Sequence, residues 1–190
     1  MKRRKIIVAV TGASGSLYAR LLLGRLGSQP GNKLVTAVIF SDNSKEIWKH
    51  ELRGDFVLPA GMKLYENNDF NAPFASGSSD WDTMIICPAS MGTIGRIAGG
   101  ISNDLIARAA DVMLKERRKL IVVPRETPWN LIHLTNLKNL TEAGAIVCPA
   151  NPSFYTLPES VNDLAMTVVE RVLDLAMIEG DHKRWQHDGK

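Results

Sequence analysis

An arginine and a glutamate stand side by side between two prolines, at the end of a segment that should be buried. Arg125 and Glu126 follow Pro124 and the apolar run 120–123, which is typical of a strand covered on both faces. The guanidinium can bind a phosphate through charge-assisted hydrogen bonds, worth about 1.5–3 kcal/mol. The carboxylate repels a phosphate, so we expect Glu126 to transfer protons, with a pKa raised by burial. A surface ion pair between the two neighbours is the alternative, which the flanking prolines disfavour.

A glycine-rich segment, TGASGS at residues 11–16, follows the apolar run 5–10. Such a turn leads into a helix whose free backbone N–H groups can bind an anion or a polar ring. The segment lacks the G-x-G-x-x-G fingerprint of dinucleotide sites and the G-x-x-x-x-G-K-[ST] of phosphate loops, which counts against nicotinamide and nucleoside triphosphate ligands. A tight strand-to-helix turn without a ligand is the structural alternative.

Hydroxyl groups follow two further apolar runs. Ser90 and Thr93, in a turn after the run 83–88, can donate to phosphate oxygens, although helix capping would explain either hydroxyl alone. Tyr155, in the proline-framed loop 151–158, is either a ligand contact or a packing residue. The four histidines lack metal-ligand spacing and no nucleophile elbow is present, so a zinc enzyme or a hydrolase is disfavoured and no metal is expected.

The elements that must position these residues are short apolar runs alternating with helical patterns. The runs predict strands at 5–10, 34–40, 83–88, 119–124 and 145–149. The helical patterns cover 16–27, 44–52, 102–116, 128–143 and 160–178, with Thr127 and Pro128 as N-cap and first-turn residues of the fourth. This alternation predicts an α/β protein with a mostly parallel sheet. Because ligands bind at the carboxyl ends of parallel strands, the candidate residues should meet at one edge.

The composition predicts one domain and a small anionic ligand. A chain of 190 residues, 45% of them hydrophobic, can form a single domain over 1–190 with a sizeable core. A net charge of +3 with both signs scattered along the chain argues weakly for anionic small ligands and hardly for nucleic acid. Gly12 interrupts the apolar start, which favours a strand over a secretory signal, and no run approaches the roughly 20 apolar residues that cross a bilayer. Cys87 and Cys148 indicate reduced thiols in the cytoplasm.

Four segments of the chain match a known family. They are TGASGS, PASMGTIGRIAGGISNDLIARAADVMLKERRKLIVVPRETPWNLIHL, GAIVCPANPSFY and the closing RW. Together they resemble the UbiX-type flavin prenyltransferases along nearly the whole chain. The resemblance implies a Rossmann-like three-layer fold, a homo-dodecamer with region 158–190 at subunit contacts, and no metal. It also implies transfer of the dimethylallyl group of dimethylallyl phosphate to N5 and C6 of reduced FMN, and a UbiD-type decarboxylase that receives the prenylated flavin.

The resemblance assigns site residues by motif. The FMN site would comprise Gly12, Ala13, Ser14, Ser41, Ser90, Met91, Gly92, Thr93 and Arg125. Dimethylallyl phosphate would be held by Tyr155 and Arg171, with Glu51, Arg108, Lys115, Glu126 and Trp185 around its phosphate and prenyl chain. In this scheme the cations Lys115, Arg108 and Arg171 assist phosphate departure, and Ser14 and Glu51 join the catalytic set. Trp185 would line an allylic cation, and some residues would come from neighbouring subunits.

Two residues depart from the family pattern. Asp42 follows Ser41 where a basic or small residue is expected, so its carboxylate should point away from the FMN phosphate. Trp129 is bulkier than the expected leucine and should reshape the pocket wall. The alternative functions are a flavin-dependent decarboxylase of cysteine-containing substrates, whose later asparagine-methionine motif is not seen here, and a non-catalytic FMN carrier.

Overall fold

A six-stranded sheet in the order β3-β2-β1-β4-β5-β6 forms the centre of the computed structural model, which describes residues 3–29 and 34–178. Each neighbouring pair of these strands is parallel, so the predicted α/β class and strand direction are confirmed. The strands are β1 (Arg4–Val10), β2 (Leu34–Phe40), β3 (Met62–Tyr65), β4 (Thr83–Ala89), β5 (Lys119–Pro124) and β6 (Ile146–Val147).

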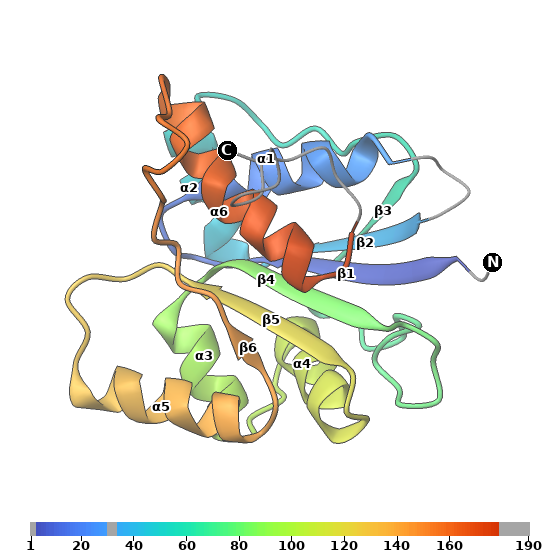
Figure 1. Ribbon diagram of the computed structural model, residues 1–190. Coiled ribbons are helices and arrows are strands. Elements are labelled where there is room, and N and C mark those ends of the chain that lie inside the picture. The colour runs from blue at the N-terminus through green and yellow to red at the C-terminus, as the bar shows by residue number, and fades with distance from the viewer. Residues whose placement is uncertain (1–2, 30–33, 179–190) are drawn as a thin grey trace, which may run out of the picture.

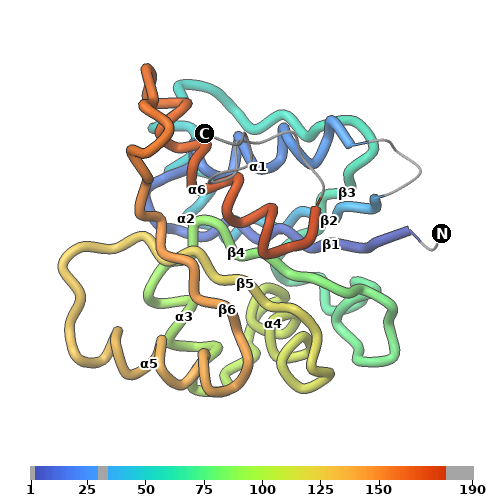
Figure 2. The backbone as a smooth tube through the Cα atoms, viewed as in Figure 1, coloured from blue at the N-terminus to red at the C-terminus, as the bar shows by residue number. Residues whose placement is uncertain are grey.

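Helices cover both faces of the sheet and give the expected three layers (Figure 1). One layer contains α1 (Ser16–Gly27), α2 (Asp42–Leu52) and α6 (Val161–Leu175). The other contains α3 (Met91–Ala98), α4 (Leu105–Lys115) and α5 (Leu131–Glu142). Figure 2 shows the chain between β6 and α6, in orange, passing from the second layer to the first.

The central strands bury side chains on both faces, which explains their continuous apolar runs. In β4, Ile86 belongs to the core beneath α3, α4 and α5, whereas the adjacent Ile85 belongs to the core beneath α1 and α6. Ile7 and Val8 of β1 divide between the two cores in the same way. The alternation follows from the two-residue period of a strand.

The order of the strands reverses beside β1. The chain leaves β1 for β2 and β3 on one side, and later returns to build β4, β5 and β6 on the other. In open parallel sheets, the gap outside the carboxyl ends of the strands at such a switch point is where ligands bind. The fold therefore places the main candidate site at the ends of β1, β2 and β4.

Two elements were not predicted from the sequence. β3 is an edge strand of Met-Lys-Leu-Tyr in which Lys63 and Leu64 are exposed, so it lacks the apolar run of the buried strands. α3 occupies the segment that was interpreted as a turn around Ser90 and Thr93. Its glycines, Gly92 and Gly95, obscure its helical pattern in the sequence.

The predicted starts of two helices were wrong by about one turn. α4 begins after Asp104, whose side chain accepts a hydrogen bond from the N–H of Ala107 at 2.8 Å. α5 begins after Asn130, which forms a capping box with His133, and not at Thr127 and Pro128. In both cases a side chain that satisfies the first free backbone N–H groups fixes the start of the helix.

Candidate functional site

A pocket of about 400 Å³ lies at the switch point of the sheet. Its lining residues come mainly from the segments that follow β1, β2 and β4: Gly12, Ser41, Asp42, Asn43, Asn67, Ser90, Gly92, Thr93, Arg96 and Asp104. Five of these were in the predicted FMN set, namely Gly12, Ser41, Ser90, Gly92 and Thr93. The expectation that the candidate residues meet at the carboxyl edge is therefore confirmed for these five.

The two halves of the sheet are joined at this edge by Thr11. Its buried hydroxyl donates to the carbonyl of Pro88 at 2.8 Å and accepts from the backbone N–H of Ser90 at 2.7 Å. The pairing of β4 with β5 is irregular between Ile86 and Ala89, around a proline that has no N–H to donate. The Ser90 turn is thus held mainly from the β1 side.

Ser90 and Thr93 serve as the cap of α3 as well as lining the pocket. The Ser90 hydroxyl accepts from the N–H of Thr93 at 3.3 Å and lies 3.0 Å from the Thr93 hydroxyl. A Cβ added at Gly92 would meet no atom within 4 Å, so this wall of the pocket is left open for a ligand. The capping interpretation is thus confirmed for Ser90, and both residues also line the pocket. Met91, the first residue of α3, is buried in the core.

The first glycine-rich turn differs from the expectation, because an acidic side chain of the same protein occupies its helix end. The Glu51 carboxylate accepts from the backbone N–H of Gly15 at 3.0 Å and of Ser16 at 2.7 Å. These two donors are therefore not free for a ligand anion. Burial tends to raise the pKa of Glu51, but hydrogen bonds from the Ser14 hydroxyl and from Ser16 and Gly15 outweigh it, so the pKa is lowered.

Arg125 lies beside this turn, not among the residues that line the pocket. Its Cγ would be 3.8 Å from a Cβ at Gly15, where the ring of Tyr18 would approach to 2.9 Å. Gly15 has a φ of 117°, which glycine alone adopts readily. The Nε of Arg125 is buried and has no hydrogen-bond partner among the described residues. Burial and then the Cys87 thiol raise the pKa of Tyr18, and the charge of Arg125 partly offsets them.

Apart from Asp42, four pocket residues were not among the predicted site residues: Asn43, Asn67, Arg96 and Asp104. Asn67, after β3, accepts from the N–H groups of Leu105 at 2.7 Å and Ile106 at 3.2 Å, and so holds the start of α4. Arg96 pairs with Asp104. A signal for Arg96 was present, because it follows Thr93 by three residues and must share a helix face with it.

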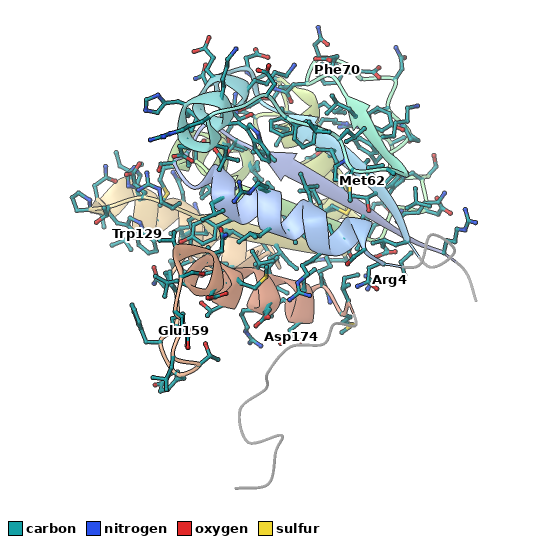
Figure 3. All side chains as sticks on the ribbon, turned by 90° about the horizontal axis from the view of Figure 1, so that it is seen from above. Arg4, Met62, Phe70, Trp129, Glu159 and Asp174 are labelled. Carbon is teal, nitrogen blue, oxygen red and sulfur yellow. The ribbon has the colours of Figure 1, made fainter. Side chains whose placement is uncertain are left out.

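Glu126 is exposed, so the burial expected for its carboxylate is not provided by its own chain. Its carboxylate accepts from the N–H of Thr127 at 2.9 Å, and its carbonyl accepts from the indole Nε1 of Trp129 at 2.9 Å. The side chain of Trp129 thus fixes the turn after β5, and Trp129 is not among the residues that line the pocket. Figure 3 shows Trp129 at the end of the molecule opposite Arg4, the first residue of β1.

Asp42 lies on the pocket wall although its side chain is exposed. That its carboxylate points away from the FMN phosphate stays a prediction. Ala13, in the first turn, is buried, and its N–H donates to the carbonyl of Thr11 at 2.8 Å.

The cations expected at the substrate phosphate are divided between the two helical layers. Arg171 lies exposed on α6, and Tyr155, in the loop before it, is 82% exposed. Arg108 and Lys115 lie on α4 in the opposite layer. Arg108 donates to the carbonyl of Ala75 at 2.9 Å, and Lys115 pairs with Glu116.

The C-terminal end of α4 is far from the pocket of its own chain. Asp104, at the start of α4, lines that pocket, and Lys115 is the last of the 11 residues in the helix. At 1.5 Å per residue, Lys115 is about 16 Å further along the axis. The single chain therefore does not bring Lys115 to the pocket. Trp185, which was also predicted near the substrate, lies outside the described residues.

Within residues 3–29 and 34–178, no group of three or more His, Cys, Asp or Glu side chains is placed to hold a metal ion. In the same part of the chain, no helix combines the length and the apolar character needed to cross a membrane.

This fold and pocket define a class of protein: a doubly wound α/β protein with a polar ligand site at its switch point. The sequence pattern of the family described as Flavoprotein matches residues 1–177. The chain is 47% identical over 184 residues to the flavin prenyltransferase UbiX of Methanocaldococcus jannaschii, covering 95% of this chain and 98% of that protein.

Two solved structures are similar over almost their whole length. AnUbiX (PadA1), in complex with FMN and dimethylallyl pyrophosphate, has a TM-score of 0.86 at 39% identity, with 97% of this chain and 98% of that chain covered. A dodecameric FMN-dependent UbiX-like decarboxylase from Escherichia coli O157:H7 has a TM-score of 0.88 at 38% identity, with 96% and 99% covered. The chain belongs to the Flavoprotein family, among its UbiX-type flavin prenyltransferases.

Proposed function

We propose that the protein transfers the dimethylallyl group of dimethylallyl phosphate to N5 and C6 of reduced FMN and releases phosphate. The observation that carries this proposal is the near full-length similarity to AnUbiX, which was solved with FMN and dimethylallyl pyrophosphate. The pocket at the switch point lies where such a fold binds its ligand. The enzyme is accordingly a prenyl-transferring flavoprotein.

The pocket residues fit a phosphate-bearing flavin. The hydroxyls of Ser41, Ser90 and Thr93 line the pocket, and α3 begins there with the positive end of its dipole. The volume of about 400 Å³ is within the usual range of ligand sites. Two buried arginine nitrogens, Nε of Arg96 and of Arg125, lack partners among the described residues. A bound flavin would supply the acceptors that these donors need.

The residues that the resemblance assigns to the site would divide the work of the reaction. Arg125 and the Ser14 turn would position the flavin, whose N5 is the nucleophile. Tyr155 and Arg171 would hold the phosphate of the second substrate as the bond from its oxygen to C1 breaks. Glu126 would transfer a proton during closure of the new ring. In the single chain Glu126 is exposed, so this role requires that another surface cover it.

We infer that Arg108 and Lys115 act in the site of a neighbouring subunit. Both are on α4, and Lys115 is at the end distant from its own pocket. Large apolar side chains are also exposed on α5 at Leu131 and Ile132, before α6 at Phe154 and Leu157, and at the first residue of α6, Val161. They support subunit contacts around α5 and around the start of α6. The dodecameric relative from Escherichia coli supports a homo-dodecamer.

A flavin-dependent decarboxylase is the second candidate, because the Escherichia coli relative is described as a decarboxylase. One anaerobic experiment separates the candidates. The protein is mixed with reduced FMN and either dimethylallyl phosphate or dimethylallyl pyrophosphate, and the released phosphate or pyrophosphate and the mass of the flavin are measured. Release of phosphate with addition of one prenyl unit to FMN supports the transferase. Absence of both with either donor would exclude it, and binding of FMN would then leave the decarboxylase or a carrier.

The product is proposed to serve a UbiD-type decarboxylase, which would use the prenylated flavin as its cofactor. We also propose a cytoplasmic location. Cys87 and Cys148 are both free thiols in the described structure, as a reducing compartment requires.

A further inference from the structure

Arg96 is fixed at the pocket by two neighbours. Its Nη1 lies 3.1 Å from Oδ2 of Asp104, and its Nη2 donates to the Thr93 hydroxyl at 3.3 Å. The Nε is buried and has no partner among the described residues. A guanidinium has five N–H donors in one rigid plane, so these two contacts set its orientation and leave donors available.

Arg96 is the only lysine or arginine among the described residues that line the pocket. Two carboxylates share this lining. That of Asp104 already accepts from Arg96 and from the N–H of Ala107, and that of Asp42 is exposed at the first turn of α2. The positive ends of α2 and α3 add to the charge of Arg96. Arg96 is therefore the cationic side chain that this lining offers to an anion.

The environment of Arg125 is different. Its aliphatic part packs near Gly15 and Tyr18, in the layer of α1, and it is not among the residues that line the pocket. The two arginines therefore have different surroundings: Arg96 is on α3 and lines the pocket, whereas Arg125 packs beside the turn at the start of α1.

We propose that Arg96 is the cation that contacts the phosphate of FMN, and that Arg125 contacts a part of the flavin remote from the phosphate. This rests on the proposed function, since it concerns the same pocket. It moves the phosphate contact, which the sequence suggested for Arg125, to a residue of α3. Thr93 and Asp104 act as positioning residues, because they orient the guanidinium of Arg96.

The test compares FMN with riboflavin, which lacks the phosphate. Binding of each oxidised flavin to the flavin-free protein is followed by fluorescence for the wild type, Arg96→Gln and Arg125→Gln. Loss of a charged hydrogen bond to phosphate should weaken FMN binding to Arg96→Gln about 10- to 100-fold and leave riboflavin binding unchanged. Arg125→Gln should weaken both flavins to a similar degree.

Arg25→Gln is the matched control. Arg25 is also a partly exposed helical arginine, and it lies 3.7 Å from its partner Glu170 near the end of α1, away from the pocket residues. It should leave both affinities unchanged. Riboflavin binding reports whether the pocket of Arg96→Gln is intact, so a merely structural role of the Arg96 pair would weaken both ligands.

Equal loss of FMN and riboflavin affinity in Arg96→Gln, or no loss of either, would overturn the assignment. If Arg96→Gln does not fold, Arg96→Met takes its place, because methionine keeps an unbranched side chain but removes the charge. A preferential loss of FMN is still expected, and an unchanged preference overturns the proposal. A wild-type protein that binds no FMN would instead refute the proposed function.

Discussion

The carboxylate of Glu51, in the last turn of α2, accepts a 2.7 Å hydrogen bond from the backbone N–H of Ser16, at the start of α1. A second backbone donor, Gly15, completes the contact. Glu51 thus takes the place that the sequence suggested for a ligand anion. It also joins two helices of one layer just beside the pocket.

Replacing Glu51 with glutamine should make the free energy of unfolding less dependent on pH in the acidic range. The pKa of Glu51 is lowered in the folded protein, so the carboxylate stabilises the fold above its unfolded pKa, and this stabilisation is lost as the pH falls through the folded pKa. At pH 7 the variant should be less stable by about 0.3–1 kcal/mol, since the contact is partly open to solvent. Urea unfolding from pH 7 to pH 3 should show this difference shrinking below about pH 4.5. A difference that is constant with pH would contradict the prediction.

Thr11→Val should weaken both the fold and the flavin site. The change keeps the shape but leaves the partly buried N–H of Ser90 without its acceptor, at a cost of about 1–3 kcal/mol in the free energy of unfolding. FMN affinity should also fall, because Ser90 is a pocket residue. Urea unfolding and flavin fluorescence measure the two effects.

Thr167→Val is the control for Thr11→Val. The Thr167 hydroxyl likewise accepts a backbone N–H, from Ser153 at 2.9 Å, and donates to the carbonyl of Leu164 at 2.8 Å, but on α6. Its replacement should lower stability and leave FMN affinity unchanged. Equal effects of the two variants on FMN affinity would show that Thr11 has no specific role at the pocket.

Glu126→Gln should separate flavin binding from turnover. Glutamine keeps the oxygen that accepts from Thr127 but cannot act as an acid or base, so FMN affinity should stay within about twofold while turnover falls about 10²–10⁴-fold. Flavin attached to the prenyl group at N5 alone should accumulate. It has the mass of the final product, so chromatography and absorbance must distinguish the two under anaerobic conditions. Formation of the finished product at the wild-type rate would leave Glu126 without a catalytic role.

The Lys115→Ala variant and the Arg125→Ala variant should each be inactive alone, whereas mixed oligomers that contain both variants should be partly active. If one subunit supplies Arg125 and its neighbour supplies Lys115, co-expression of the two variants restores about a quarter of the sites when subunits assort at random. Prenylation activity of the purified mixed oligomer measures this. Lys115→Ala mixed with Arg108→Ala is the control: both residues are on α4, so no site receives the two intact side chains together. No recovery in the first mixture would place Lys115 in its own subunit's site.

The buried parts of the fold could be predicted from the sequence because their patterns are local. β2 and β5 begin and end where the apolar runs predict, and α1 covers the predicted residues 16–27. β3 could not be predicted, since an edge strand with an exposed face needs few apolar residues. The start of α5 at Asn130 was missed because proline and threonine gave an equally good local signal for a helix start.

The predicted residues that line the pocket all lie within four positions of the end of a strand. They are Gly12, Ser41, Ser90, Gly92 and Thr93. The contact between Glu51 and the first turn joins residues more than 30 positions apart, and no local pattern indicates it. The motif indicated that Lys115 is a site residue. The length of α4 shows that Lys115 does not reach the pocket of its own chain.

During synthesis on the ribosome, the Thr11 contact and the pairing of β1 with β4 can form only after β4 has been made. β1, β2 and β3 are adjacent in the sheet and are synthesised first, whereas β4 follows the long segment after β3. Until β4 emerges, β1 exposes one edge of unpaired N–H and C=O groups, which can pair with other chains. A nascent chain at this stage is therefore most open to misassembly. It also cannot bind flavin, because half of the pocket has not yet been made.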